Sequence, residues 1–173
     1  MNHDSYEDAY IGGILNSVKT IAMVGASAND VRPSFFVLKY LLNKGFEVYP
    51  VNPGQAGKEI LGRMCYARLA DIPVALDMVD IFRASDAVPG VVDEVLKLEP
   101  LPKVIWTQLT VRNDEAATRA EAAGIKVVMN RCPKIEYGRL SGEIAWTGVN
   151  SGVLSSKKPI MRPGFQSFGI RQK

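Results

Sequence analysis

Five short segments of the chain carry the residues that could bind a charged ligand, and each directly follows an apolar run. They supply small residues for close backbone approach, hydroxyl and amide donors, and two arginines, but no carboxylate. Such a set favours an anionic, phosphate-bearing ligand, because phosphate oxygens accept hydrogen bonds and attract guanidinium groups. The segments are Gly25-Ala26-Ser27, Asn52-Pro53, Arg83-Ala84-Ser85, Thr107-Gln108 and Asn130-Arg131-Cys132.

Residues suited to catalysis are few. The only histidine is His3, which we expect to lie in a frayed N-terminus, so the sequence predicts no phosphohistidine relay, histidine-based triad or histidine-rich metal site. Ser27 stands in V-G-A-S rather than in G-x-S-x-G, and a nucleophile elbow is therefore unsupported. The sequence predicts neither a catalytic residue nor a metal ligand.

Cys132 is the best candidate for covalent chemistry. It follows Arg131, whose charge would lower the pKa of the thiol and favour the reactive thiolate. The alternative is a small buried residue before Pro133. Cys65 and Cys132, the two cysteines of the chain, make neither a disulfide framework nor a zinc-binding spacing.

Continuous apolar runs indicate the strands that position these segments. Runs without polar alternation are typical of parallel strands that are buried on both faces. The runs are 20–24, 46–51, 76–82, 103–106 and 125–129. Because ligands of parallel sheets bind outside the carboxyl ends of the strands, all five segments would meet at one edge of the sheet.

Helical patterns separate most of these runs. One expected helix covers 5–18, and a second starts at Pro33 with Phe36, Val37, Tyr40 and Leu41 on one face. A third contains Val88, Val91, Val92 and Val95 at helical spacing. A fourth covers 116–123, with a cap at Asn113 before it and Gly124 after it. Residues 52–75 read as a loop with a short strand or turn. The alternation predicts an α/β fold, a doubly wound, mostly parallel five-stranded sheet of Rossmann type with helices on both faces.

The loop after the first strand lacks the dinucleotide fingerprint G-x-G-x-x-G, since no glycine follows Gly25 before the expected helix. NAD binding also favours an acid at the end of the second strand, where this chain has Asn52 and Pro53. These differences disfavour NAD without eliminating it. On sequence alone, Arg83 is a phosphate ligand or an ion-paired surface residue, and Trp106 is a core residue or an adenine platform.

Length and composition predict one main domain. The chain has 173 residues, of which 47% are hydrophobic and 23% charged, as in ordinary globular proteins. We expect a domain over 1–145 and a basic C-terminal extension over 146–173 that is partly disordered or packs on a subunit. Five cations and no acid lie in 144–173, yet without aromatic residues between them they do not predict a nucleic-acid site.

The sequence is expected to contain neither a membrane span nor a signal peptide, and this predicts a cytoplasmic location.

Several motifs carry a family resemblance over most of 18–140. In chain order these are V-G-A-S with R-P-S, V-N-P-G, F-R-A-S and N-R-C-P-K-I-E. The sequence resembles the small stand-alone CoA-binding proteins, whose domain also forms the N-terminal part of the succinyl-CoA synthetase alpha subunit. The resemblance implies a Rossmann-type sheet with coenzyme A across the carboxyl ends of its strands.

The resemblance also implies contacts for each part of the ligand. The residues near the phosphates would be Gly25, Ala26, Ser27, Arg32, Pro33 and Ser34, and those that flank the adenosine would be Val51, Asn52 and Pro53. Beside the adenosine contacts, the ligand would touch Phe82, Arg83 and Ser85. The far side of the ligand would be lined by Trp106, Gln108, Asn130, Arg131 and Cys132. Two positions depart from the family pattern. The family usually has a glycine near the position of Thr110, and it usually has an acidic residue at the position of Asn130.

In the synthetase, the catalytic histidine belongs to a second domain with no counterpart in this sequence. The resemblance therefore implies a non-catalytic CoA or acyl-CoA binding protein, acting as a regulator or a carrier and able to form homo-oligomers. An NAD(P)-dependent oxidoreductase and a CoA-ligase subunit that acts with another chain are the alternatives. A mixed disulfide between Cys132 and CoA is a further possibility if the thiolate forms.

Overall fold

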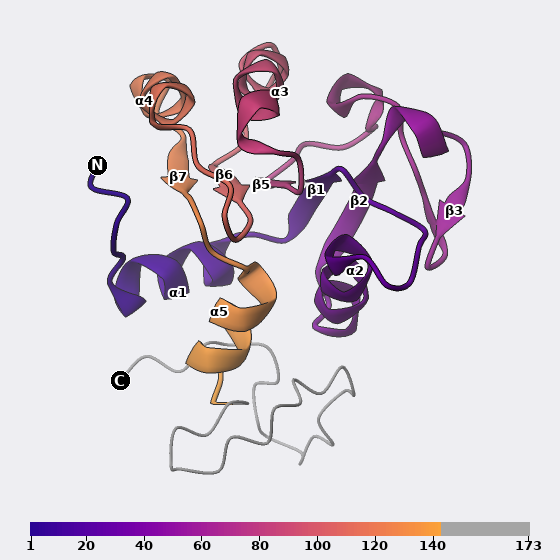
Figure 1. Ribbon diagram of the computed structural model, residues 1–173, viewed down its shortest axis with the longest axis horizontal. Coiled ribbons are helices and arrows are strands. Elements are labelled where there is room, and N and C mark those ends of the chain that lie inside the picture. The colour runs from indigo at the N-terminus through magenta and orange to yellow at the C-terminus, as the bar shows by residue number, and fades with distance from the viewer. Residues whose placement is uncertain (143–173) are drawn as a thin grey trace.

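The computed structural model describes residues 1–142 and contains the predicted five-stranded parallel sheet (Figure 1). Its strands lie in the order β2-β1-β5-β6-β7. Their bounds are β1 Thr20–Val24, β2 Glu47–Val51, β5 Met78–Ile81, β6 Val104–Thr107 and β7 Lys126–Val128. All five apolar runs are therefore strands, and the fold prediction is confirmed.

Helices cover both faces of the sheet, as expected for a doubly wound fold (Figure 1). The helices on one face are α1 (Asp8–Ser17), α2 (Pro33–Asn43) and α5 (Pro133–Leu140); those on the other are α3 (Val88–Val95) and α4 (Asp114–Ala122). Each face has its own buried apolar cluster. Within the described residues, no helix has the length and apolar character needed to cross a membrane.

Local sequence signals account for most helix positions. The four valines of α3 are buried, as their spacing predicts. Asn113 caps α4, since its side-chain oxygen accepts a hydrogen bond from the Ala116 N–H at 2.9 Å. Gly124 follows α4 with a φ of +84°, the left-handed conformation that glycine adopts without strain. Phe36 differs from the prediction, because its side chain is half exposed beside the buried face of α2.

The sequence patterns missed one helix and anticipated the short strands of one loop. Helix α5 was not predicted, although Pro133 stands at its first turn as Pro33 does in α2. The loop expected over 52–75 contains the short hairpin of β3 (Glu59–Ile60) and β4 (Arg63–Met64), which agrees with the predicted short strand. The extension predicted over 146–173 lies outside the described residues.

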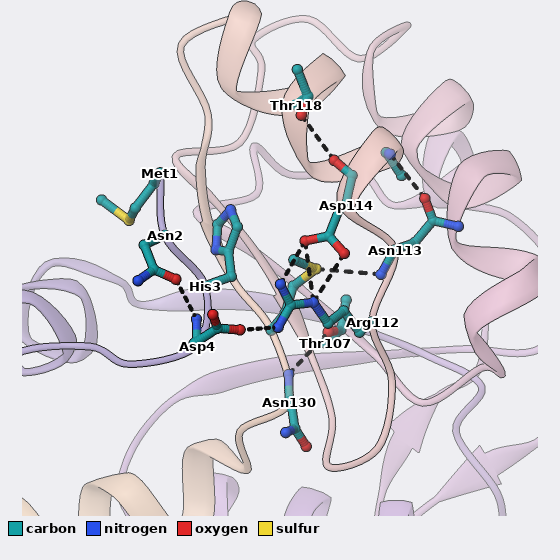
Figure 2. A network of polar contacts seen from close by, with 12 residues as sticks. Met1, Asn2, His3, Asp4, Thr107, Arg112, Asn113, Asp114, Thr118 and Asn130 are labelled. Carbon is teal, nitrogen blue, oxygen red and sulfur yellow. Dashed lines mark hydrogen bonds and ion pairs between the residues drawn. The ribbon is translucent and has the colours of Figure 1, made fainter.

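The N-terminal segment is ordered against the edge strand β7, so the expectation that His3 lies in a frayed terminus is wrong. The His3 ring is buried, with Nδ1 2.9 Å from the Tyr6 hydroxyl, and burial lowers its pKa. The Tyr6 hydroxyl in turn accepts a hydrogen bond from the Met129 N–H at 2.8 Å. Figure 2 shows Asp4 beside the Arg112 guanidinium, which also binds Asp114. These contacts join the terminus to β7 and to the loop after β6.

The strand order places a crevice at the carboxyl edge of the sheet. From β1 the chain continues outward to β2, then returns to the other side of β1 to form β5. The loops that follow β1 and β5 therefore lead to opposite faces of the sheet and separate from each other. Doubly wound proteins bind their ligands at this switch point.

Candidate functional site

A cavity of about 800 Å³ opens at the switch point between β1 and β5. Its walls come from the loops after β1, β5 and β6 and from the first turns of α2 and α5. Nine of the predicted ligand contacts line it: Gly25, Ser27, Arg32, Pro33, Ser34, Phe82, Arg83, Gln108 and Cys132. The loops that form three of the five strand-end segments thus meet around one space, and Cys132 adds part of a fourth.

The segment after β2 supports the wall of the cavity from outside. The Asn52 side-chain N–H donates to the Ala26 carbonyl at 2.7 Å, and its oxygen accepts from the Gly54 N–H at 3.0 Å. Val51, Ala26 and Pro53 are likewise absent from the lining. Asn52 therefore connects the ends of β1 and β2.

Several predicted residues on the far side have other partners. Trp106 is fully buried, and its indole N–H donates to the Arg131 carbonyl at 2.8 Å, so it is a core residue without surface for a ligand. The Arg131 guanidinium lies over the Tyr6 ring, on the side of the N-terminal segment. The Ser85 hydroxyl accepts from the Arg112 N–H at 3.0 Å. Ser85, Trp106, Asn130 and Arg131 lie outside the cavity lining.

Cys132 lines the cavity as a neutral thiol. Burial raises its pKa to about 11, and the nearby Asp80 acts in the same direction. Because Arg131 binds the N-terminal segment, it does not stabilise a thiolate. The predicted lowering of the Cys132 pKa is wrong, and the mixed disulfide with CoA loses its chemical basis.

Gly25 allows the ends of β1 and β5 to approach each other. Its φ is +88°, and its N–H donates to the Val51 carbonyl at 2.9 Å. A Cβ atom at this position would lie 3.2 Å from the Phe82 backbone carbon and oxygen and from the Arg83 Cδ. Both the left-handed backbone and the contact with β5 thus require glycine here.

Three cations surround the cavity, and no acidic side chain of the described residues lines it. These cations are Arg32, Arg83 and Lys134, and within residues 1–142 none of them has a carboxylate partner. By contrast, Arg112 and Arg139 each bind carboxylates elsewhere. Unpaired positive charge around a concave site favours an anionic ligand.

One acid, Asp80, lies beneath the cavity and was missed. It is fully buried in β5, where both of its carboxylate oxygens accept from the Gln108 side-chain N–H₂, at 2.9 and 3.2 Å. Burial raises its pKa to about 7, and the Gln108 hydrogen bond partly opposes that rise. The signal in the sequence was a charged residue inside an apolar run, at 76–82.

Residues 19–138 match the model of the CoA binding domain, which is more than half of the chain. The chain belongs to this family. The uncharacterized protein YneT of Bacillus subtilis (strain 168) is 36% identical to this chain over 129 residues, which are 75% of this chain and 93% of YneT.

Solved and larger relatives agree with this assignment. A hypothetical protein from Pyrococcus horikoshii OT3 shares 40% identity and a TM-score of 0.74, over 81% of this chain and 96% of that protein. The acetate–CoA ligase (ADP-forming) I of Archaeoglobus fulgidus is 29% identical over 147 residues, which are 80% of this chain but only 21% of the ligase. The CoA binding domain is thus related to a part of ADP-forming ligases.

Two departures from the family pattern meet at the rim of the cavity. Thr110 has a φ of +68° and Asn130 a φ of +54°, both left-handed. The Thr110 N–H donates to the Asn130 side-chain oxygen at 2.8 Å. The two residues therefore hold the loops after β6 and β7 together, and the backbone of Thr110 has a conformation that glycine adopts without strain.

Replacing Thr110 with glycine is expected to stabilise the protein by about 1 kcal/mol. A left-handed backbone costs a non-glycine residue about 1–2 kcal/mol, and the freedom of glycine in the unfolded chain offsets part of the gain. Thermal unfolding would show a rise in Tm of about 2–4 °C. The matched control is Thr118→Gly inside α4, which should lower stability by about 0.3 kcal/mol, the difference in helix propensity between threonine and glycine. A Thr110→Gly protein no more stable than wild type would contradict strain at this position.

Proposed function

We propose that this protein binds CoA or acyl-CoA in the cavity between β1 and β5 without catalysing a reaction on its own, as a regulator or carrier. The observation that carries the proposal is the set of three cations, none with a carboxylate partner, around a cavity with no acidic lining among the described residues. CoA has three phosphate groups, which match such a site. Membership of the CoA binding domain family supports the same ligand.

The residues of the cavity divide into a polar and an apolar part. Arg32, Ser34 and the first turn of α2 would hold phosphates, because the N–H groups at a helix N-terminus point outward and favour negative charge. Phe36, Leu109 and Ile135 are partly exposed apolar side chains in the same lining, and they would contact the less polar arm of the ligand.

Among the described residues, the cavity lining contains no histidine or carboxylate that could serve as a general base. Its thiol, Cys132, stays protonated at neutral pH. These features support binding without catalysis. Similarity to a ligase supports one alternative, a CoA-ligase subunit that acts with another chain. NAD binding has less support, since the Asn52 side chain is already bound to Ala26 and Gly54.

Saturating CoA is expected to raise the Tm of the protein by about 5–10 °C, whereas NAD and NADP leave it unchanged. A ligand at about 100 times its Kd stabilises the folded state by about 2.7 kcal/mol, and each kcal/mol moves the Tm of a domain of this size by about 2–4 °C. Differential scanning fluorimetry with CoA, acetyl-CoA, NAD and NADP on one preparation measures this. A shift with NAD and none with CoA would overturn the proposal in favour of an oxidoreductase.

Arg83→Ala is expected to weaken CoA binding about 10- to 100-fold while leaving the Tm of the free protein almost unchanged. A hydrogen bond between charged groups is worth about 1.5–3 kcal/mol, and Arg83 has no carboxylate partner within residues 1–142 to lose. Isothermal titration calorimetry gives the affinity. Arg68→Ala is the control, because Arg68 lies outside the cavity and binds Asp71. If Arg83→Ala lowers the free energy of unfolding of the ligand-free protein by as much as it lowers the free energy of CoA binding, Arg83 is a structural residue.

A further inference from the structure

Asp80 and Gln108 form a polar pair at the base of the cavity. Asp80 is fully buried in β5, where its register places it beside Met23 of β1 and Trp106 of β6. Gln108 follows β6 directly, is 8% exposed, and lines the cavity. The pair therefore connects the interior of the sheet to the surface that a ligand would touch.

The chemistry of Asp80 orients the Gln108 amide. The N–H₂ of Gln108 faces Asp80, with distances of 2.9 and 3.2 Å to the two carboxylate oxygens, and this is the arrangement that the ionised form of Asp80, which only accepts hydrogen bonds, favours. The amide oxygen then points away from Asp80. In residues 1–142 no buried side-chain oxygen lacks a partner, and no donor binds the Gln108 Oε1, so this oxygen is accessible. Gln108 lines the cavity and its N–H₂ is bound to Asp80, so Oε1 is the side-chain group of Gln108 that is left for a ligand there.

We infer that the Asp80–Gln108 pair determines ligand specificity. It presents a fixed hydrogen-bond acceptor, the Gln108 side-chain oxygen, which selects ligands that bring an amide N–H to this part of the cavity. This inference rests on the proposed function and names the part of CoA that is recognised, the amide-bearing pantetheine arm. Gln108 contacts the ligand, and Asp80 is a positioning residue. A ligand without a donor would leave the acceptor desolvated and unpaired, which is the strongest basis for rejection in a protein site.

The pair also explains why an acid is tolerated under a site for phosphates. Asp80 does not line the cavity, whereas Gln108, to which it is hydrogen-bonded, does. The amide presents the same acceptor character as the carboxylate without its charge, because it donates to Asp80 and offers its own oxygen to the ligand. A neutral group therefore meets the ligand where a direct carboxylate would repel it.

The test compares the affinities for CoA and for adenosine 3′,5′-bisphosphate, which has the nucleotide part of CoA but not the pantetheine arm. Gln108→Leu is expected to weaken CoA binding about fivefold and to leave bisphosphate binding unchanged. Asp80→Leu should weaken CoA alone to a smaller extent, and the double variant should be no worse than Gln108→Leu, since Asp80 acts through Gln108. Glu115→Leu is the control, because Glu115 is exposed in α4 and lies outside the lining.

Equal losses for both ligands, or no loss for either, would overturn the inference. Additive losses in the double variant would overturn the positioning role of Asp80. If Asp80→Leu does not fold, Gln108→Leu still tests the acceptor. A wild-type protein that binds neither ligand would refute the proposed function itself. If the wild-type protein binds both ligands and Gln108→Leu changes neither affinity, only the inference about Gln108 fails.

Discussion

The free energy of unfolding of the wild-type protein is expected to fall by about 4 kcal/mol as pH rises, because burial disfavours the ionised form of Asp80 in the folded state. Asp80→Asn is expected to remove this fall. The pKa of Asp80 is raised from 3.8 to about 7 by burial. In that interval the folded protein keeps a proton that the unfolded chain has released, so the folded state loses stability as pH rises. Each pKa unit corresponds to about 1.4 kcal/mol. The destabilisation is therefore absent below about pH 4 and complete above about pH 7.

Urea unfolding of wild type and Asp80→Asn at several pH values between about 4 and 8 measures this difference. The comparison must be between the two proteins, because the lowered pKa of His3 acts in the opposite direction in part of this range and is common to both. The carboxyl of Asp77, with a pKa lowered to about 2, loses its contribution only at more acidic pH. Asp86→Asn is the control, since Asp86 is exposed. Parallel profiles for wild type and Asp80→Asn would refute an ionisable buried Asp80.

Gly25→Ala is expected to destabilise the free protein by about 3 kcal/mol and to lower its Tm by about 6–12 °C. The left-handed backbone of Gly25 costs an alanine about 1–2 kcal/mol. The added Cβ would also meet the Phe82 backbone and the Arg83 Cδ at 3.2 Å, and such crowding typically costs about 1–3 kcal/mol. Because Arg83 would have to move, CoA affinity should fall as well.

Gly13→Ala is the matched control for this substitution. Gly13 lies inside α1, without a left-handed backbone, and a Cβ atom added there would have open space within 4 Å. Alanine there should stabilise the helix by about 0.5–1 kcal/mol. Thermal unfolding of both variants should thus give shifts of opposite sign. A Gly25→Ala protein as stable as wild type would show that β1 and β5 do not require glycine at their point of approach.

Together, these results would separate two roles of the cavity residues. Gly25 is needed to build the site, and its replacement should affect the protein without ligand. Arg83 is exposed and unpaired among the described residues, so its replacement should affect only the complex. The Asp80–Gln108 pair combines both roles, because its buried charge reduces stability at neutral pH while it orients an acceptor toward the ligand.

The sequence by itself determined the elements and the edge where the site lies. Continuous apolar runs are sufficient to predict strands buried on both faces, and parallel strands direct all their carboxyl ends to one edge. The Asn113 cap and the four valines of α3 are local signals that the structure follows. That Gly25 and Arg83 would lie at the same edge of the sheet could be predicted, since both directly follow apolar runs; the structure added that β1 and β5 are neighbours.

Only the tertiary structure decided the chemical state of individual side chains. The pKa values of Cys132 and Asp80 depend on burial by residues distant in sequence, while the neighbour Arg131 faces another partner. His3 is buried for the same reason, since the N-terminal segment packs where no local pattern predicts it. Periodicity reports which face of an element is apolar. It does not report which segment covers that face, and desolvation by the covering segment sets charge and reactivity.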